Sequence, residues 1–392
     1  GSGAPLLRGR RVTAPGRGLE KVRAALDAYR GASADDAGLD LLVGTPCFAP
    51  PDALTAAMRQ AATTATFDYS SNQGTLALRE AIVQVRAALG ESWGPEHVFV
   101  THGAKVAALA VLGTLLRPGD EVVVPVPAYG PYRALPGLFG ARLVPVEREP
   151  PRFAFDSDRI AAAIGTRTRV VLLASPCNPT GAVLDPEAER GLHEVARSRG
   201  AVLVLDRAYE WFRQDPGDAT PVSAAGPEGP VRLHSFSKTY GLCGWRMGYV
   251  LGASDLVERL TAFQASNLNP PNTLVQRGLE AVPAVPASFH EAAAGQVRLR
   301  VAALRAALEA GGLSVAPPAG GFYLFADARD AMRRTGLPDS AEFCRRLAAE
   351  VGLALTPGTD FGIEGWVRAS AVALLDPDAA GDVTRRLRAF AA

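Results

Sequence analysis

The feature that most restricts the fold is a series of short β-branched runs that alternate with helical stretches between about residue 97 and residue 252. The runs are HVFVTHG, EVVVPVP, RVVLLASP, AVLVLDRAY, VRLHSFSK and RMGYVLG. Runs this apolar fit strands of a parallel sheet that is covered on both faces. Between them, residues 104–120 and 186–200 carry apolar residues at helical spacing and end on helix-stop signals. The alternation predicts an α/β fold.

A different pattern begins after roughly residue 285. A long helical stretch, SFHEAAAGQVRLRVAALRAALEAGG, precedes strand-like runs in GGFYLFADA and WVRASAVA, with a helix between these runs and another at the end. This order indicates a second, α+β layer. With 392 residues the chain is long for a single core, so we expect one large domain and one smaller domain.

Charge and composition restrict the partners. The chain has 41 basic and 40 acidic residues, so no large single-sign field attracts nucleic acid or an anionic membrane. The longest apolar stretch, 106–116, is too short to span a bilayer. The cysteines lack metal-ligand spacing and predict reduced thiols and no bound metal; they are Cys47, Cys177, Cys243 and Cys344. We expect a cytoplasmic protein that acts on a small molecule.

Ligands of open α/β sheets bind at the carboxyl ends of the strands, so the residues that follow each run are the candidates for a binding site. After HVFVT the chain passes His102 and Gly103 into a helix whose free N–H groups form an anion site. The later runs are followed by polar groups in this order: Asn178 in SPCNPTG, Asp206 and Tyr209 in DRAY, and Ser237 and Lys238 in SFSK. Each motif alone is more often a turn or a helix cap.

Taken together, the ordered set resembles the pyridoxal-phosphate enzymes of fold type I, specifically the class I and II aminotransferases. The segment SFSKTYGLCGWRMG, residues 235–248, matches the family pattern S-x-S-K-x-x-G-x-x-G-x-R-x-G at every position. The resemblance extends from about residue 40 to about residue 372. It implies an aspartate aminotransferase-like fold, with a mostly parallel seven-stranded sheet between helices and a smaller α+β domain. We expect an N-terminal arm and part of the small domain at 1–48, a large domain at 49–284 and the rest of the small domain at 285–392.

The resemblance implies that pyridoxal 5′-phosphate is the cofactor. Lys238 would hold the cofactor as a Schiff base and, once displaced by the substrate amine, would move a proton. Asp206 would pair with the protonated ring nitrogen. The remaining cofactor contacts implied by the family are a phosphate set of Gly103, Ala104, Lys105, Ser235, Ser237 and Arg246, an aromatic stack from Tyr129, and hydrogen bonds to the ring oxygen from Asn178 and Tyr209. Tyr69 resembles the tyrosine that reaches the phosphate from the neighbouring subunit, which implies a homodimer with shared active sites.

For the substrate, Arg368 resembles the arginine that grips the α-carboxylate of an amino acid, assisted by Asn178 and the backbone near Gly44. The implied reaction moves the amino group of an L-amino acid to a 2-oxo acid through a pyridoxamine phosphate form. An enzyme that acts on a dicarboxylic amino acid is expected to have a second cationic side chain that binds the side-chain carboxylate of the substrate. The segment NLNPPNTLVQ supplies Asn267 and Asn269 instead, so aspartate specificity is not predicted.

Some positions depart from the family pattern. Arg207 in DRAY replaces an acid that often follows the key aspartate, and Cys47 in GTPCF stands where an acidic or polar residue is common. His102 is as well explained by packing as by a role toward the substrate, and Trp245 and Tyr249 are expected in the core. These departures remove no expected cofactor contact.

Two other functions are compatible with the same residues. Elimination, β- or γ-replacement and cyclisation of an amino acid start from the same negative charge at Cα, and fold and cofactor do not settle the reaction type. A cofactor-binding sensor without catalysis is the second alternative, although no basic helix-turn-helix stretch precedes residue 40.

Overall fold

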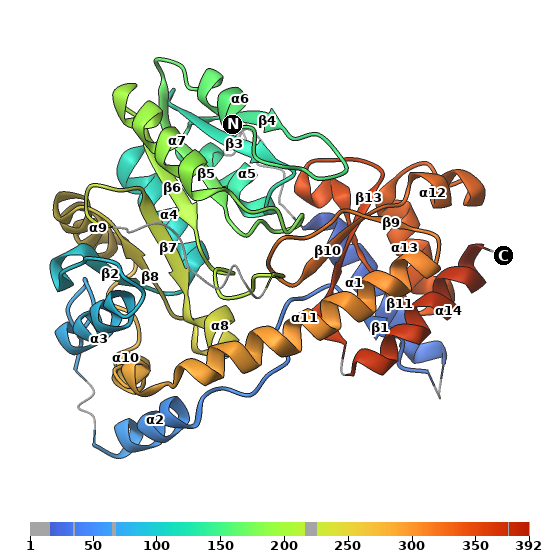
Figure 1. Ribbon diagram of the computed structural model, residues 1–392, viewed down its shortest axis with the longest axis horizontal. Coiled ribbons are helices and arrows are strands. Elements are labelled where there is room, and N and C mark those ends of the chain that lie inside the picture. The colour runs from blue at the N-terminus through green and yellow to red at the C-terminus, as the bar shows by residue number, and fades with distance from the viewer. Residues whose placement is uncertain (1–15, 34–35, 65–67, 216–225, 375, 392) are drawn as a thin grey trace, which may run out of the picture.

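The computed structural model describes residues 16–33, 36–64, 68–215, 226–374 and 376–391. Its largest sheet has seven strands in the order β2-β8-β7-β6-β5-β3-β4 (Figure 1). The strands are β2 Val98–Thr101, β3 Glu121–Val126, β4 Arg142–Glu147, β5 Thr168–Ala174, β6 Val202–Asp206, β7 Val231–Ser235 and β8 Gly248–Leu251. β8 runs antiparallel to both of its neighbours, and the other pairs are parallel. The predicted mostly parallel seven-stranded sheet is confirmed.

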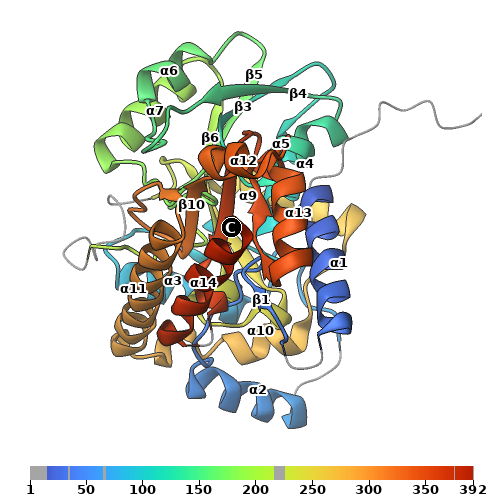
Figure 2. The same cartoon turned by 90° about the vertical axis from the view of Figure 1, so that its right-hand side faces the viewer.

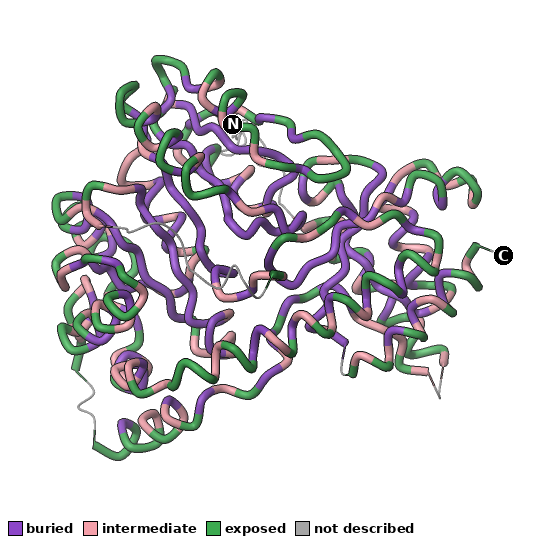
Figure 3. Tube along the Cα trace, viewed as in Figure 1, coloured by how far each residue is buried: buried purple, intermediate pink, exposed green. Residues whose placement is uncertain are grey.

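Helices cover both faces of this sheet. Successive strand residues point to opposite faces, and Val122 and Val124 of β3 lie in one core cluster whereas Val123 lies in another. The first cluster includes residues of α4 (Ala104–Leu115), α5 (Gly130–Leu138) and α9 (Ser254–Asn267), and the second includes residues of α6 (Ser157–Ala162) and α7 (Pro186–Ser198). The strands other than the edge strand β4 are therefore largely buried from both sides, and Figure 3 shows burial along the trace.

The second part of the fold is built on a smaller antiparallel sheet. Its order is β12-β13-β10-β9, with β9 Ser314–Val315, β10 Tyr323–Asp327, β12 Thr356–Pro357 and β13 Trp366–Ser370. β1 (Leu39–Asp40) pairs in parallel with β11 (Leu353–Ala354), so residues from the start of the chain join this C-terminal part. Its helices are α1 Arg17–Ala32, α11 Ala287–Ala310, α12 Arg329–Thr335, α13 Ser340–Val351 and α14 Ala380–Ala391 (Figure 2).

The long helix α11 runs from the region of the large sheet to the C-terminal part (Figure 1). Other helices lie beside the large sheet: α2 Asp52–Thr64, α3 Leu76–Ala87, α8 Phe236–Thr239 and α10 Thr273–Leu279. Short 3₁₀ turns complete the chain at Pro95–His97, Cys243–Trp245, Val282–Ala284, Gly358–Phe361, Ala371–Ala373 and Pro377–Ala379. Within the described ranges, no helix is long and apolar enough to cross a membrane.

Candidate active site

Two adjoining cavities contain most of the predicted site residues. The Asp206 cavity, about 270 Å³, is lined by Ala104, Lys105, Tyr129, Asn178, Asp206, Tyr209, Ser235, Ser237, Lys238 and Arg246, together with Tyr132, Ala174 and Ala208. The Arg368 cavity, about 380 Å³, shares Lys105, Tyr129, Asn178, Tyr209 and Lys238 with it and adds Gly44 and Arg368. The parallel strands explain this gathering, because their carboxyl ends meet at one edge of the sheet.

Lys238 lies in the short helix α8 directly after β7 and lines both cavities. Its Nζ donates to the carbonyl of Gly44 at 2.6 Å and contacts Sγ of Cys243 at 3.7 Å. The ring of Phe322 lies 5.9 Å from the same Nζ. The amine is therefore held at the junction of the two cavities.

Asp206 ends β6 and is buried at the closed end of its cavity. Tyr132 donates its hydroxyl to Oδ2, and the backbone N–H of Ala208 donates to Oδ1 at 2.9 Å. Among the described residues, no cation forms an ion pair with this carboxylate. Burial raises the pKa of Asp206, because a buried charge without a counter-ion is costly.

Tyr132 is a site residue that the sequence reasoning missed. It lies three positions after Tyr129 at the start of α5, and the two rings meet edge to face at 5.4 Å. Residues three apart share one face of a helix, so the spacing in PAYGPY indicates that Tyr129 and Tyr132 point the same way. The family pattern includes only Tyr129.

The opposite end of the Asp206 cavity gathers hydrogen-bond donors. Helix α4 begins there with no side-chain cap, so its first N–H groups and its positive dipole end face outward. Added Cβ atoms would fill this cradle: at Gly248 the Cβ would lie 2.9 Å from N of Ala104, and at Gly103 3.2 Å from Nη2 of Arg246. Gly103 also has a φ of +94°, which favours glycine. The hydroxyls of Ser235 and Ser237 line the same cavity.

Arg368 lies in β13 and is 5% exposed. Its Nη1 donates to Oδ1 of Asn178 at 3.0 Å, and its Nη2 donates to the carbonyl of Leu42 at 2.5 Å and to Oγ1 of Thr356 at 3.2 Å. The rings of Tyr323 and Phe361 pack over the guanidinium at 4.2 and 4.8 Å. In the part of the chain that the structure describes, no carboxylate pairs with it.

Tyr69 is not brought into either cavity, and its side chain is 88% exposed. The segment around it is nevertheless anchored, because Thr273 Oγ1 donates to the carbonyl of Asp68 at 3.1 Å and Gln276 Nε2 donates to Oγ of Ser70 at 2.9 Å. Helix α10 thus holds this tyrosine outward.

The unusual positions have separate structural explanations. Arg207 turns away from Asp206 and pairs with the buried Glu189. His102 lines neither cavity, and burial lowers the pKa of its imidazole. Tyr249 is buried in the core as expected, whereas Trp245 is only partly buried against it. The cysteines are free, and Cys177 and Cys344 are buried.

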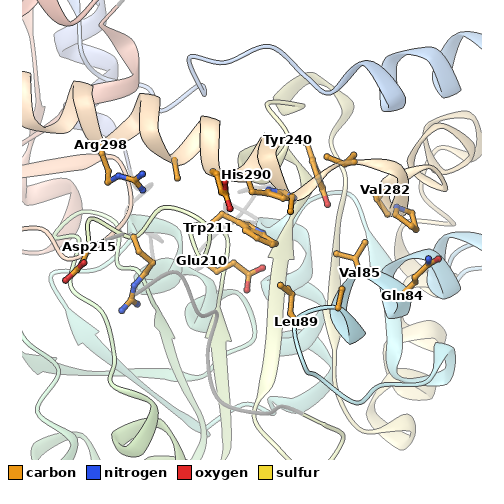
Figure 4. Close-up of a pocket in the computed structure, with 17 residues that line it drawn as sticks. Gln84, Val85, Leu89, Glu210, Trp211, Asp215, Tyr240, Val282, His290 and Arg298 are labelled. Atoms are coloured by element: carbon orange, nitrogen blue, oxygen red, sulfur yellow. The ribbon is translucent and has the colours of Figure 1, made fainter. Parts of the chain in front are cut away.

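A larger cavity, about 630 Å³, lies elsewhere, between α3, the segment after β6 and α11 (Figure 4). Trp211 and His290 stack at 3.8 Å in its wall, and Arg298 and Asp215 lie at one end, away from Val282 and Gln84. Its lining mixes apolar side chains with charged and polar ones, and none of the predicted site residues is among them. Volume alone does not mark a site. The predicted lysine and carboxylate instead line the Asp206 cavity, at the carboxyl ends of the parallel strands.

Comparison with known proteins decides the family. A family model described as aminotransferase class I and II matches residues 37–387. The chain belongs to the class I and II aminotransferases. An aspartate/prephenate aminotransferase of Thermus thermophilus is 33% identical over 341 residues, covering 85% of this chain and 87% of that protein. An arginine–pyruvate transaminase of Pseudomonas aeruginosa is 31% identical over 341 residues, covering 85% and 86%.

A solved structure of a mutant aspartate aminotransferase of Thermus thermophilus superposes with a TM-score of 0.87 at 29% identity, covering 98% of this chain and 100% of that one. These similarities confirm the predicted aspartate aminotransferase-like fold. They also identify this aminotransferase as an enzyme that depends on pyridoxal phosphate.

The residues of this aminotransferase fit that cofactor chemically. The Asp206 cavity is lined by an uncapped helix start and two serines, which suit a phosphate. It is also lined by a buried carboxylate that pairs with no cation among the described residues, which suits a protonated ring nitrogen. Lys238 and the aromatic side chain of Tyr129 line the same cavity. The donor set and its polarity therefore match the group that the family uses.

Proposed function

We propose that this enzyme transfers the amino group of an L-α-amino acid to a 2-oxo acid, with Arg368 binding the α-carboxylate of each. One observation carries the proposal: Arg368 is a buried guanidinium that faces a cavity and has no carboxylate partner among the described residues. A buried positive charge of this kind costs free energy unless an anion pairs with it. A substrate carboxylate supplies that anion in a bidentate geometry.

The neighbours of Arg368 fix its direction. Asn178 and Thr356 accept hydrogen bonds from the two terminal nitrogens, while Tyr323 packs over the guanidinium. A carboxylate held there places the substrate Cα toward Lys238, which lines the same cavity. Orientation of this kind converts binding energy into rate, because the bond to be broken is held in a fixed direction.

Bound pyridoxal phosphate supplies an electron-accepting ring that carries the amino nitrogen and stabilises negative charge at Cα. The chain itself supplies the proton transfers. Lys238 Nζ, at the junction of the cavities, would take the proton from the substrate Cα and pass it to the cofactor carbon bonded to the amino nitrogen. Asp206 would maintain a positive charge on the bound ring, and Tyr132 holds that carboxylate by donating its hydroxyl.

The substrate side chain would lie against the remaining wall of the Arg368 cavity. This wall is mainly apolar, with Leu19, Leu42, Pro131 and Phe361, and Lys105 and Asp360 add one charge of each sign. We therefore propose that donors with apolar side chains are accepted. The relatives are described as acting on aspartate or prephenate and on arginine, so members of the family differ in the substrate that they accept.

A donor and acceptor panel tests the proposed function. Purified holoenzyme is mixed with single L-amino acids and a 2-oxo acid, and both the new amino acid and the new oxo acid are measured by mass spectrometry. Arg368→Gln should raise KM for every donor by roughly 10- to 1000-fold, the range expected for loss of a buried charge-assisted pair. Lys238→Ala should abolish the absorbance of the covalently bound cofactor.

The surface variant Arg329→Gln is the matched control, because Arg329 forms an exposed ion pair with Asp327. It should leave KM unchanged. Absence of amino transfer with every donor would contradict the proposal. A product that keeps its α-nitrogen would identify replacement or cyclisation instead, and an oxo acid formed with free ammonia would identify elimination.

We also propose that the enzyme acts as a homodimer in which Tyr69 completes the partner's Asp206 cavity. The support is the exposure of this aromatic side chain, which is 88% accessible although α10 holds its segment in place. A large exposed tyrosine on an anchored segment is typical of an interface residue.

A further inference from the structure

Arg148 follows β4 and is a second buried arginine without a carboxylate partner in the described ranges of the chain. Its side chain is 5% exposed. Nη1 donates to the carbonyl of Phe153 at 2.7 Å and to Oγ1 of Thr180 at 3.4 Å. Nη2 donates to the carbonyl of Pro127 and contacts Sγ of Cys177 at 3.2 Å. Neutral acceptors of the protein therefore face both terminal nitrogens, whereas the buried Nε has no hydrogen-bond partner among the described residues.

Arg148 differs from Arg368 in what its guanidinium faces. Arg148 lines neither the Asp206 cavity nor the Arg368 cavity. As in Arg368, both terminal nitrogens donate to acceptors within the fold, and the ring of Phe155 lies 4.7 Å from Cζ of Arg148. Unlike Arg368, the guanidinium of Arg148 faces neither of the cavities in which a ligand carboxylate could bind. The charge thus acts on the fold and not on a ligand.

Besides Phe153, the contacts of Arg148 belong to two loops that carry proposed site residues. Pro127 precedes Tyr129 by two residues in the loop after β3, and Cys177 and Thr180 flank Asn178 in the loop after β5. The thiol of Cys177 also contacts the carbonyl of Pro127 at 3.8 Å. One guanidinium therefore joins the two loops directly behind Tyr129 and Asn178.

This link lies beyond the point where the backbone pairing ends. The β3–β5 register runs to Val123 opposite Val171, whereas β3 continues to Val126 and β5 to Ala174. Hydrogen bonds of the sheet therefore do not set the spacing of the two loops. The planar guanidinium of Arg148, whose N–H donors point in fixed directions, can set the spacing of the two loops.

We propose that Arg148 is a positioning residue for the aminotransferase reaction: it fixes the distance between Tyr129 and Asn178 and thereby the width of the Asp206 cavity at the cofactor ring. This inference rests on the proposed roles of these two residues. Asn178 also accepts a hydrogen bond from Arg368 at 3.0 Å, so a displaced loop would disturb both cavities.

The test measures ring binding without covalent chemistry. The full chain, freed of its cofactor, is titrated with 4-deoxypyridoxine 5′-phosphate, which has no aldehyde to react with Lys238, and with inorganic phosphate. Arg148→Lys keeps the positive charge but removes the planar guanidinium. It should weaken binding of the cofactor analogue about tenfold or more, because hydrogen bonds from a charged donor are lost. Phosphate affinity should change by less than about twofold, because the phosphate donors lie on other segments.

Arg386→Lys is the matched control, since Arg386 is equally buried but pairs with Asp36 and Asp382 far from the two loops. It should lower the melting temperature and leave analogue binding unchanged. A double variant, Cys177→Ala with Thr180→Val, removes the contacts of Arg148 to one loop while retaining the arginine. It should weaken analogue binding in the same direction, and it replaces Arg148→Lys if that variant does not fold.

The outcomes separate this inference from the proposed function. Failure of the wild-type chain to bind the analogue would remove the proposed cofactor site itself. If the folded Arg148→Lys variant or the folded double variant binds the analogue as tightly as wild type does, the positioning role is overturned. This holds even if the melting temperature of the variant falls. An equal loss of analogue and phosphate affinity would also overturn it, because the effect would then be general.

Discussion

At the scale of single residues, Asp206 is the group whose chemistry the fold constrains most. The carboxylate is buried, accepts hydrogen bonds from Tyr132 and from the N–H of Ala208, and has no ion-pair partner in the described chain. Burial raises its pKa. The protein without cofactor therefore bears a cost. In the proposed site a cationic ring nitrogen would offset this cost, which would link stability to cofactor binding.

Asp206→Asn should make the cofactor-free protein more stable at neutral pH and nearly inactive when loaded. A carboxyl group whose folded pKa is raised contributes stability below its ordinary pKa and loses it as pH rises through the folded value. The melting temperature of Asp206→Asn relative to wild type should therefore increase as pH rises above about 4. Turnover should fall by roughly 100-fold or more, because the positive charge on the ring is no longer supported.

Thermal unfolding of the cofactor-free proteins at several pH values measures this difference. The exposed Asp158 in α6 provides the control variant Asp158→Asn, which should show no such trend. A stabilisation of Asp206→Asn that shrinks with rising pH would contradict the argument.

Most of the site is predictable residue by residue because its groups follow strands, and the ends of parallel strands meet. Lys238, Asp206 and Asn178 were expected in one site on that basis and share the Asp206 cavity. Tyr132 and Arg148 were not predicted, because each acts through a contact made only after the chain folds. Arg148 lies after β4, and nothing in its neighbouring sequence indicates that Pro127 and Cys177 are its acceptors.

At the scale of elements, a buried chain of ion pairs joins α3, α7, β7 and the segments beside them. Its members, in order of contact, are Arg207, Glu189, Arg232, Glu91, Arg86, Glu210 and His234. Arg207 is the departure from the family pattern noted above, and its charge is matched by Glu189. The substitution is therefore accommodated by a partner on α7.

Glu189→Gln should destabilise the enzyme by roughly 3–5 kcal/mol, because Arg207 and Arg232 would each lose a buried counter-ion. Urea unfolding at neutral pH measures the change. Glu187 lies two residues earlier on α7 and is exposed, so Glu187→Gln should change stability by less than about 0.5 kcal/mol. Equal effects of the two variants would show that the buried chain of ion pairs contributes little.

The contact between α11 and the segment after β6 should respond to pH. His290 of α11 stacks on Trp211 at 3.8 Å, and burial lowers the pKa of His290 to about 4. A histidine with a lowered folded pKa contributes full stability above its ordinary pKa and loses it as pH falls toward the folded value. Wild type should therefore lose stability relative to His290→Gln between about pH 6.5 and pH 4.

Urea unfolding of the two proteins across this interval is the measurement. His193, which is only half-buried, supplies His193→Gln as the control, and its unfolding free energy should follow that of wild type. A constant difference between wild type and His290→Gln would refute the expectation.

Strands buried on both faces were predicted, and the exposed edge strand was not. The six apolar runs correspond to β2, β3, β5, β6, β7 and β8. β4, residues 142–147, lies at the edge of the sheet and exposes several of its side chains, including Arg142 and Glu147. Its sequence RLVPVE also contains a proline, which is tolerated at a sheet edge. Periodicity identifies a strand only where burial imposes it.

At the scale of the whole molecule, the Arg368 cavity combines residues from distant parts of the chain. Gly44 comes from the N-terminal region, Lys238 from the large sheet and Arg368 from the C-terminal sheet. The order of motifs predicted that these residues share a function. Their distances could not be predicted, because they depend on how β1 and β11 pair and how the two sheets lie against each other.

The proposed dimer makes the strictest prediction at this scale. Tyr69 lies outside both cavities of its own chain and is 88% exposed. If it completes the partner's site, a hybrid dimer of one Lys238→Ala subunit and one Tyr69→Ala subunit contains one site with both residues intact. Mixing the two nearly inactive homodimers under mild dissociating conditions should then restore turnover, up to about half the wild-type rate per purified hybrid dimer.

The same hybrid distinguishes the two possible arrangements. If Tyr69 served its own subunit, the subunit that keeps Lys238 would lack the tyrosine, and the hybrid would be no more active than Tyr69→Ala alone. Pairing Lys238→Ala with the double variant Lys238→Ala/Tyr69→Ala is the control, since neither site then has the lysine. Restored turnover in the first hybrid but not in the second requires that each site takes its lysine from one chain and its tyrosine from the other.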